Sequence, residues 1–143
     1  DPEGTGAARA MKAAMHDAGV SASEIVHLNA HATSTPAGDI AESMAIHAAL
    51  GDQTPKVCVS ATKSMTGHLL GAAGAIESVA TVLSVVNNII PPTINHFTDD
   101  PAFDTKLNFT FNKAQQRTVR AALCNTFGFG GHNASIIIKK YQA

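Results

Sequence analysis

Two histidines in this sequence follow short apolar runs that are rich in β-forming residues. His31 comes just after the run 24–29, and His68 lies a short way beyond the run 56–60. A neutral imidazole can donate a hydrogen bond or move a proton near pH 7, so two of them at one site could stabilise negative charge that develops in a reaction. The chain holds seven histidines, and most histidines are solvated or satisfied by local hydrogen bonds. The residue type alone therefore does not single out His31 or His68.

The elements that must position these histidines follow from the hydrophobic pattern. The pattern predicts three helices, over 7–18, 39–50 and 71–87. It predicts five strands, over 24–29, 56–60, 106–112, 118–125 and 134–140. Strand and helix alternate at the start, which predicts parallel pairing, whereas the later strands are closely spaced, which predicts antiparallel pairing in the same sheet. The predicted fold class is α/β, with one five-stranded mixed sheet and helices packed on it.

Three polar segments leave the ends of these strands, over 31–36, 61–68 and 126–133. Ligands of open α/β sheets bind beyond the carboxyl ends of the strands. We therefore expect the three segments to converge on one pocket at one rim of the sheet.

The composition argues against several kinds of partner. Ten basic and eleven acidic residues, with no sizeable run of either sign, provide no electrostatic footprint for nucleic acid or an anionic membrane. The longest apolar stretch, from Leu69 to about Val86, is interrupted by Glu77, which favours a buried helix of a soluble protein over a membrane span. Cys58 and Cys124 lie in β-like segments without CxxC spacing, so we predict structural thiols, a reducing compartment and no metal site.

Three motifs carry a resemblance to a known family. NAHATSTPAGD, SATKSMTGHLLGAAGAIE and NTFGFGGHN occur in this order, and with the helices between them they span essentially the whole chain. The sequence resembles the β-ketoacyl-[acyl-carrier-protein] synthases, in particular the type I and type II elongating condensing enzymes of the thiolase superfamily. The resemblance implies that residues 1–143 form the C-terminal half of a thiolase-like fold. The start, Asp-Pro-Glu-Gly-Thr-Gly, is expected to lie inside a longer chain whose N-terminal half carries a nucleophile cysteine.

The resemblance also implies a reaction. In this family a cysteine accepts an acyl chain, malonyl-[acyl-carrier-protein] loses carbon dioxide, and the resulting carbanion attacks the acyl thioester in a Claisen condensation. His31 and His68 match two family histidines, whose neutral N–H groups bind the malonyl thioester oxygen as the enolate forms. Which histidine has which role is left open. The substrates travel on the phosphopantetheine of acyl carrier protein, so no separate cofactor is expected.

Lys63 and Glu77 match a family lysine and glutamate that pair near the histidines. A buried pair is favoured over two surface residues because Glu77 lies inside an otherwise apolar helix. Asp39 and Glu42, at a helix start, either cap that helix and complement its dipole or support Lys63.

Further residues match the family's substrate-binding and gating positions. Thr33 and Thr35 match threonines whose hydroxyls bind the phosphopantetheine arm. Phe129 matches a gating phenylalanine whose backbone N–H completes the oxyanion hole with that of the cysteine, and the flanking Gly128 and Gly130 permit the backbone path and mobility this requires.

Phe127 is assigned to the core. The sequence departs from the common family pattern at Ala32, where many relatives carry glycine, and at His132, where many carry threonine. His132 is treated as a loop residue.

His68 within KSMTGH favours the Cys-His-His branch of the superfamily, and HATSTP favours a discrete fatty-acid enzyme. A polyketide or mycolate-type ketosynthase and a non-catalytic partner resembling a chain-length factor stay as alternatives. The implied partners are acyl carrier protein, the N-terminal half of the same enzyme and, at full length, a second copy in a homodimer. The implied location is the bacterial cytoplasm or an organellar stroma or matrix. The chain alone is expected to be inactive and to expose a large apolar face.

Overall fold

The computed structural model describes residues 1–103 and 106–141. The α-helices are α1 (Thr5–Ala18), α2 (Pro36–Leu50), α3 (Lys63–Thr66) and α4 (Ala73–Asn87), and short 3₁₀ turns cover Ala22–Glu24, Gly51–Lys56 and Leu70–Ala72. The strands are β1 (Ile25–Asn29), β2 (Cys58–Ser60), β3 (Ile89–Ile90), β4 (Asn108–Phe109), β5 (Gln115–Gln116), β6 (Ala121–Gly128) and β7 (His132–Lys139).

The main sheet has five strands in the order β4-β2-β1-β6-β7. β1 pairs in parallel with β2 and β6, β2 pairs in parallel with β4, and β7 is antiparallel to β6. The predicted five-stranded mixed sheet is thus confirmed. The expected strand 106–112 is wrong in extent and direction, because only Asn108–Phe109 pair with β2, in parallel, and Phe111 forms an isolated parallel bridge with Thr93. A small second sheet of β3 and β5 was not predicted.

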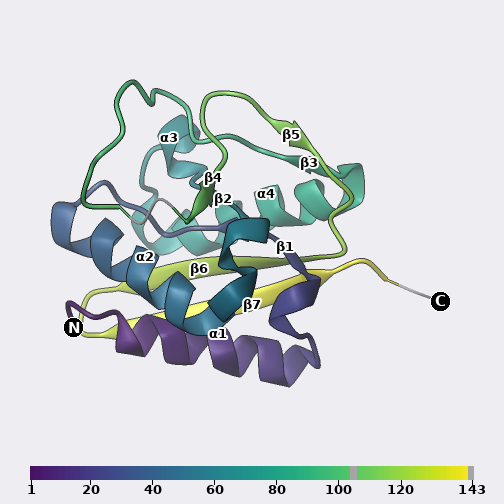
Figure 1. Ribbon diagram of the computed structural model, residues 1–143, viewed down its shortest axis with the longest axis horizontal. Coiled ribbons are helices and arrows are strands. Elements are labelled where there is room, and N and C mark those ends of the chain that lie inside the picture. The colour runs from purple at the N-terminus through teal and green to yellow at the C-terminus, as the bar shows by residue number, and fades with distance from the viewer. Residues whose placement is uncertain (104–105, 142–143) are drawn as a thin grey trace.

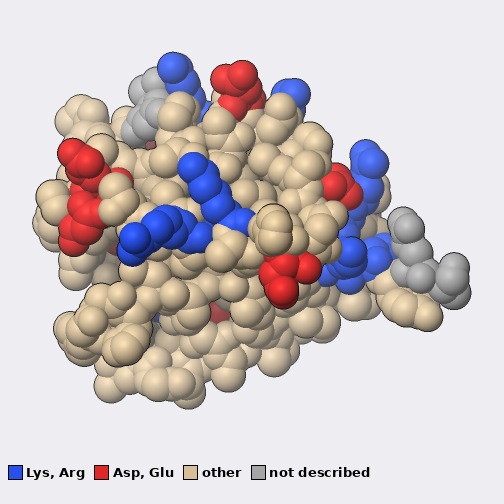
Figure 2. All heavy atoms as spheres, turned by 90° about the horizontal axis from the view of Figure 1, so that it is seen from below, with Lys and Arg blue, Asp and Glu red and all other residues tan. Residues whose placement is uncertain are grey.

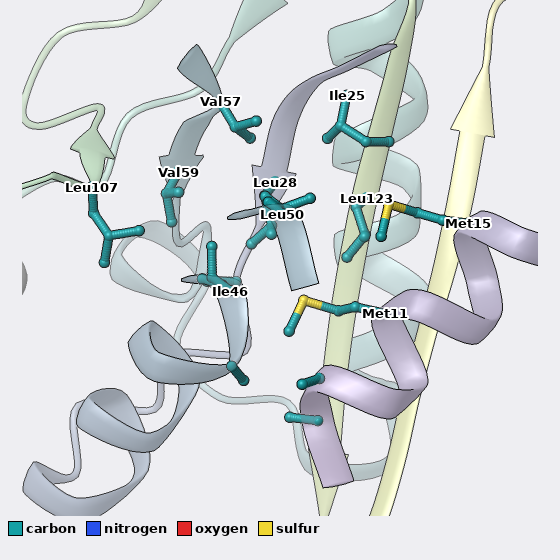
Figure 3. Close-up of a cluster of buried hydrophobic side chains, with 14 of the residues drawn as sticks. Met11, Met15, Ile25, Leu28, Ile46, Leu50, Val57, Val59, Leu107 and Leu123 are labelled. Carbon is teal, nitrogen blue, oxygen red and sulfur yellow. The ribbon is translucent and has the colours of Figure 1, made fainter. Parts of the chain in front are cut away.

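The main sheet is the middle of three layers, with α1 and α2 over one face and α4 over the other (Figure 1). Met11 and Met15 of α1 and Ile46 and Leu50 of α2 point toward the strand residues of the sheet (Figure 3). Ile25 and Leu28 of β1 share this core although strict alternation would place them on opposite faces. A register shift between Ile25 and His27 accounts for it.

Polar contacts fasten α4 to the other face of the sheet. The His27 ring lies between two hydroxyls, with Nδ1 3.0 Å from Ser84 Oγ and Nε2 3.0 Å from Ser60 Oγ. The Asn29 amide donates to Thr81 Oγ1 at 3.2 Å. Burial lowers the pKa of His27 to about 4, so this ring is neutral near pH 7. The contacts fix α4 relative to the strand that leads to His31.

The outer side of α4 is apolar and uncovered. Its exposed apolar side chains are Ile76, Val79, Val82, Leu83 and Val86. α4 runs at the back of Figure 1, which lies at the bottom of Figure 2. That lower part of the surface is almost free of charged side chains. The prediction of a buried helix is therefore wrong for this side. By length and composition alone the segment Leu70–Asn87 would also suffice to cross a membrane, but Glu77, Thr81 and Ser84 turn a hydrogen-bonded polar side toward the sheet.

Candidate active site

His31 and His68 meet beyond the carboxyl ends of β1 and β2. Their ring centroids are 5.6 Å apart, and the rings cross at 89°. Phe127 of β6 lies on another side of His31, with its ring centroid 5.4 Å away. The structure thus joins one residue from each of the three predicted polar segments. Phe127, which we assigned to the core, packs partly on the core and partly on His31.

The surroundings of His31 favour a neutral imidazole, and a backbone contact orients the ring of His68. Burial, then the Lys63 charge and then His68 lower the pKa of His31 to about 4. His31 Nδ1 is buried and has no hydrogen-bond partner among the described residues. The backbone N–H of Leu70 donates to His68 Nδ1 at 3.2 Å, so a neutral His68 carries its hydrogen on Nε2. Each ring can therefore act as a hydrogen-bond donor toward an incoming oxygen.

Lys63 and Glu77 form the predicted buried pair. Lys63, at the start of α3, donates from Nζ to Glu77 Oε1, and both side chains are buried. Burial raises the pKa of Glu77, and the hydrogen bond and charge of Lys63 oppose that rise. The charge of Lys63 also acts on His31 and helps to hold that imidazole neutral.

Glu42 has contacts that neither of its expected roles includes. Its carboxylate accepts the backbone N–H of His31 at 2.9 Å and that of Ala32 at 2.8 Å. It also accepts from the Asn125 amide at 3.1 Å. Glu42 lies in the second turn of α2 and therefore does not cap the helix. It holds the main chain of the histidine loop.

The loop between His31 and α2 is tightly wound. Ala32 and Ser34 have φ angles of 32° and 64°, in the left-handed region. Asp39 accepts the backbone N–H of Ser34 at 3.2 Å, so it stabilises the loop as Glu42 does. The hydroxyls of Thr33 and Thr35 lie 3.5 Å apart at the surface of this loop. Thr35 is exposed and Thr33 is half-buried.

Phe129 does not join the cluster. It stands at the tip of the β6–β7 hairpin with 99% of its surface exposed. Gly128 is the last residue of β6, and Gly130 has a φ of 82° that favours glycine. The predicted gate is thus an exposed hairpin tip in this chain.

A cavity of about 590 Å³ lies between α2, the strand ends and residues of the segments 93–103 and 107–111. Ala32, Asp39 and Glu42 contribute to its wall, but neither histidine does. His31 is half-buried and His68 is exposed, so the pair lies at the surface beside this cavity. In the described residues no group of His, Cys, Asp and Glu has the arrangement of a metal site.

Two buried asparagines were missed by the sequence reasoning. Asn29 donates to Thr62 Oγ1 at 3.2 Å and to the Glu77 carbonyl at 3.3 Å, and Asn125 donates to Glu42. Both are buried amides in strands whose other residues are mostly apolar. That pattern signals buried hydrogen-bond partners, although it does not name them.

A five-stranded mixed sheet with helices packed on it is the thiolase-like fold of a ketosynthase C-terminal domain. Residues 1–97 match the family described as "Beta-ketoacyl synthase, C-terminal domain". The chain belongs to the beta-ketoacyl synthase family.

Individual relatives agree with this assignment. The chain is 50% identical over 139 residues to 3-oxoacyl-[acyl-carrier-protein] synthase 2 of Vibrio harveyi, a match that covers 96% of this chain and 33% of the relative. It is 48% identical over 142 residues to the protein of the same name from Staphylococcus aureus (strain COL). That match covers 99% of this chain and 34% of the relative. The chain therefore spans about a third of the length of the curated relatives it matches.

Solved structures show the same fold. A beta-ketoacyl synthase from Burkholderia phymatum STM815 superposes with a TM-score of 0.87 at 38% identity, over 94% of this chain and 32% of that one. A type II polyketide ketosynthase, solved in complex with its acyl-carrier protein, gives a TM-score of 0.92 at 36% identity. The superposition covers 99% of this chain and 34% of that one.

Proposed function

We propose that this domain is the histidine-bearing part of a 3-oxoacyl-[acyl-carrier-protein] synthase that elongates fatty acids by decarboxylative Claisen condensation. The observation that carries the proposal is the edge-on pair of His31 and His68, with His31 held neutral. The identity of about half of all positions with two synthases of that name supports the substrate class.

The reaction needs stabilisation of negative charge at one oxygen. As malonyl thioester loses carbon dioxide, the electron pair of the broken carbon–carbon bond moves toward the thioester oxygen and forms an enolate. His31 and His68 donate N–H hydrogen bonds to that oxygen. A neutral donor suits this task because it lowers the energy of the enolate without giving up a proton to the carbon.

The new carbon–carbon bond forms in the next step. The enolate carbon attacks the carbonyl of an acyl group held as a thioester on a cysteine, and the tetrahedral intermediate collapses with the cysteine thiolate as leaving group. This cysteine belongs to an N-terminal portion of the enzyme, as the family resemblance implies. The backbone N–H of Phe129 supplies one oxyanion donor after the exposed hairpin closes on that portion.

The loop threonines and the hairpin glycines serve substrate binding. Thr33 and Thr35 expose hydroxyls beside the histidines and hydrogen-bond the phosphopantetheine arm of acyl carrier protein. Gly128 and Gly130 flank the gate and give its backbone freedom to move.

The apolar side of α4 packs against the N-terminal portion of the enzyme. Val79, Leu83 and Val86 are between half and two-thirds exposed on one side of α4, which is more apolar surface than a helix in a finished domain leaves open. The relatives are about three times as long as this chain, so they contain enough residues to cover it. The full-length enzyme works as a homodimer with acyl carrier protein as its partner.

The test compares this chain alone with the same chain joined to its N-terminal portion. We expect malonyl decarboxylation and condensation only from the joined protein, since covalent catalysis needs the cysteine and its half of the oxyanion hole. Condensation product from the purified chain alone, or none from the joined protein, would contradict the proposal. Replacing the nucleophile cysteine in the joined protein is the matched control and should abolish condensation.

A further inference from the structure

Asn125 is a buried amide with no exposed surface in the middle of β6. Its Nδ2 donates to Glu42 Oε1 at 3.1 Å and lies 3.5 Å from Met11 Sδ. Its Oδ1 accepts from Ser135 Oγ of β7 at 2.7 Å. Because Ser135 fixes the carbonyl side of the amide, the NH₂ side is directed toward Glu42.

Glu42 connects Asn125 to the histidine loop. The same Oε1 atom that accepts from Asn125 also accepts from the backbone N–H of His31, and Oε2 accepts from Ala32. Burial raises the pKa of Glu42, and the three hydrogen bonds oppose that rise. Loss of one donor makes the buried carboxylate less stable and frees it to rotate away from the loop.

The loop needs such a restraint. Ala32 has a φ of 32°, which an L-residue adopts at a cost, and a strained main chain persists only where its surroundings over-determine it. The two backbone hydrogen bonds to Glu42 restrain it at His31 and Ala32, and the bond from Ser34 to Asp39 restrains the following turn.

β6 touches His31 a second time. Phe127 lies on the same strand, and its ring is 5.4 Å from the His31 ring. The strand therefore contacts the side chain of His31 directly and its main chain through Asn125 and Glu42. It then continues through Gly128 to the hairpin that carries Phe129.

We propose that Asn125 is a positioning residue that fixes His31 through Glu42 and so couples the β6–β7 hairpin to the histidine loop. The inference rests on the proposed function, because it assigns His31 to the decarboxylation step. It goes beyond that function in naming a residue that touches neither substrate nor either imidazole.

The experiment uses the chain joined to its N-terminal portion and the variant Asn125→Ala. Malonyl thioester decarboxylation should lose about tenfold or more in kcat, because a small misplacement of a catalytic group is costly. Its KM should stay within about threefold, and the rate of cysteine acylation should not change. The backbone ¹⁵N–¹H resonances of His31 and Ala32 should shift as their hydrogen bonds to Glu42 weaken.

Two further variants separate this role from general packing. Met11→Leu removes the sulfur contact and nearly conserves volume, so wild-type kcat is expected. Ser135→Ala keeps the Asn125 amide but removes the hydrogen bond that orients it. Like Asn125→Ala it should lower kcat, by about threefold. Ser135 is only half-buried, so this variant remains available if Asn125→Ala does not fold.

The outcomes distinguish this proposal from the proposed function. Wild-type kcat and unmoved His31 and Ala32 resonances in Asn125→Ala, or in Ser135→Ala if only that variant folds, would overturn the positioning role. An equal loss of kcat and of cysteine acylation would also overturn it, because that pattern indicates general damage. An inactive unmodified enzyme whose resonances still shift on substitution would overturn the proposed function but support the contact.

Discussion

The ring of His31 meets the ring of His68 edge-on, with centroids 5.6 Å apart. The two residues come from loops that follow neighbouring parallel strands, β1 and β2. Parallel pairing places the carboxyl ends of both strands at one rim, so residues 37 positions apart in the chain become neighbours. The geometry follows from strand direction and not from any local motif.

Breaking the Lys63–Glu77 pair should destabilise the domain. Lys63→Met leaves the Glu77 carboxyl buried without its cation, and we expect a loss of about 3 kcal/mol in unfolding free energy by urea titration at pH 7. The double variant Lys63→Met and Glu77→Leu should recover much of that loss, because no unpaired charge remains. The same loss in single and double variants would contradict this account of the pair.

The Lys63→Met variant should also change His31. The lysine charge is one cause of the lowered pKa of His31, so its removal should move that pKa upward, toward its usual range. An NMR titration of the His31 ring measures the shift.

The domain should lose stability as the pH falls, in part because of His27. Its pKa is about 4 in the folded state against an ordinary value of 6.5, so the unfolded chain binds a proton that the folded chain excludes. Stability from this residue is complete above pH 6.5 and declines as the pH falls toward 4. Linkage gives a loss of about 2 kcal/mol between pH 7 and pH 5.

Urea unfolding of the wild type and of His27→Gln at both pH values measures this effect. The variant should show a smaller difference between the two pH values, with a remainder from His31, whose pKa is also lowered. If both proteins show the same pH dependence, then His27 is not its source.

Ala32→Gly should stabilise the histidine loop slightly. Ala32 has a φ of 32°, where a Cβ atom is disfavoured. Glycine removes that strain, but it also has more conformational freedom in the unfolded chain, which opposes folding. The net increase in unfolding free energy is therefore about 0.5 kcal/mol. Ala30→Gly is the control and should be destabilising, since Ala30 is buried and has no positive φ. A loss of stability in Ala32→Gly as large as in Ala30→Gly would show that the loop is unstrained.

Sequence periodicity predicted the main layers because their determinants are local. Apolar spacing placed α1, α2 and α4 to within a few residues, and β-rich runs placed β1 and β2. β4 was overestimated because the run 106–112 is apolar enough for a strand, yet only Asn108 and Phe109 find a partner in β2. Whether a segment finds a strand to pair with depends on the tertiary structure and not on its local sequence.

The contacts of Glu42 could not be predicted from local spacing. Its position three residues after Asp39 suggested a helix cap or a partner of Lys63, whereas its carboxylate binds the main chain of His31 and the amide of Asn125. Asn125 is 83 positions away in the chain. Conversely, the family resemblance paired Lys63 with Glu77 in advance, and the position of Glu77 inside an apolar helix favoured a buried pair over two surface residues.

The chain without its N-terminal portion should self-associate through α4. Val79 and Leu83 are 58% and 53% exposed on its outer side, and burying them in a contact between copies removes apolar surface from water. Analytical ultracentrifugation should show dimers or larger species, and Val79→Lys with Leu83→Gln should shift the chain toward monomer. A stable wild-type monomer at high concentration would show that the α4 face needs no partner.

The central claim is that His31 and His68 stabilise the enolate and are not required for acylation of the cysteine. The most direct measurement is made on the chain joined to its N-terminal portion, with His31→Ala, His68→Ala and His16→Ala as the control. Decarboxylation of malonyl thioester and acylation of the cysteine are followed separately. We predict that decarboxylation disappears in the first two variants, that acylation persists at least partly, and that His16→Ala matches wild type. Wild-type decarboxylation in either active-site variant would contradict the account.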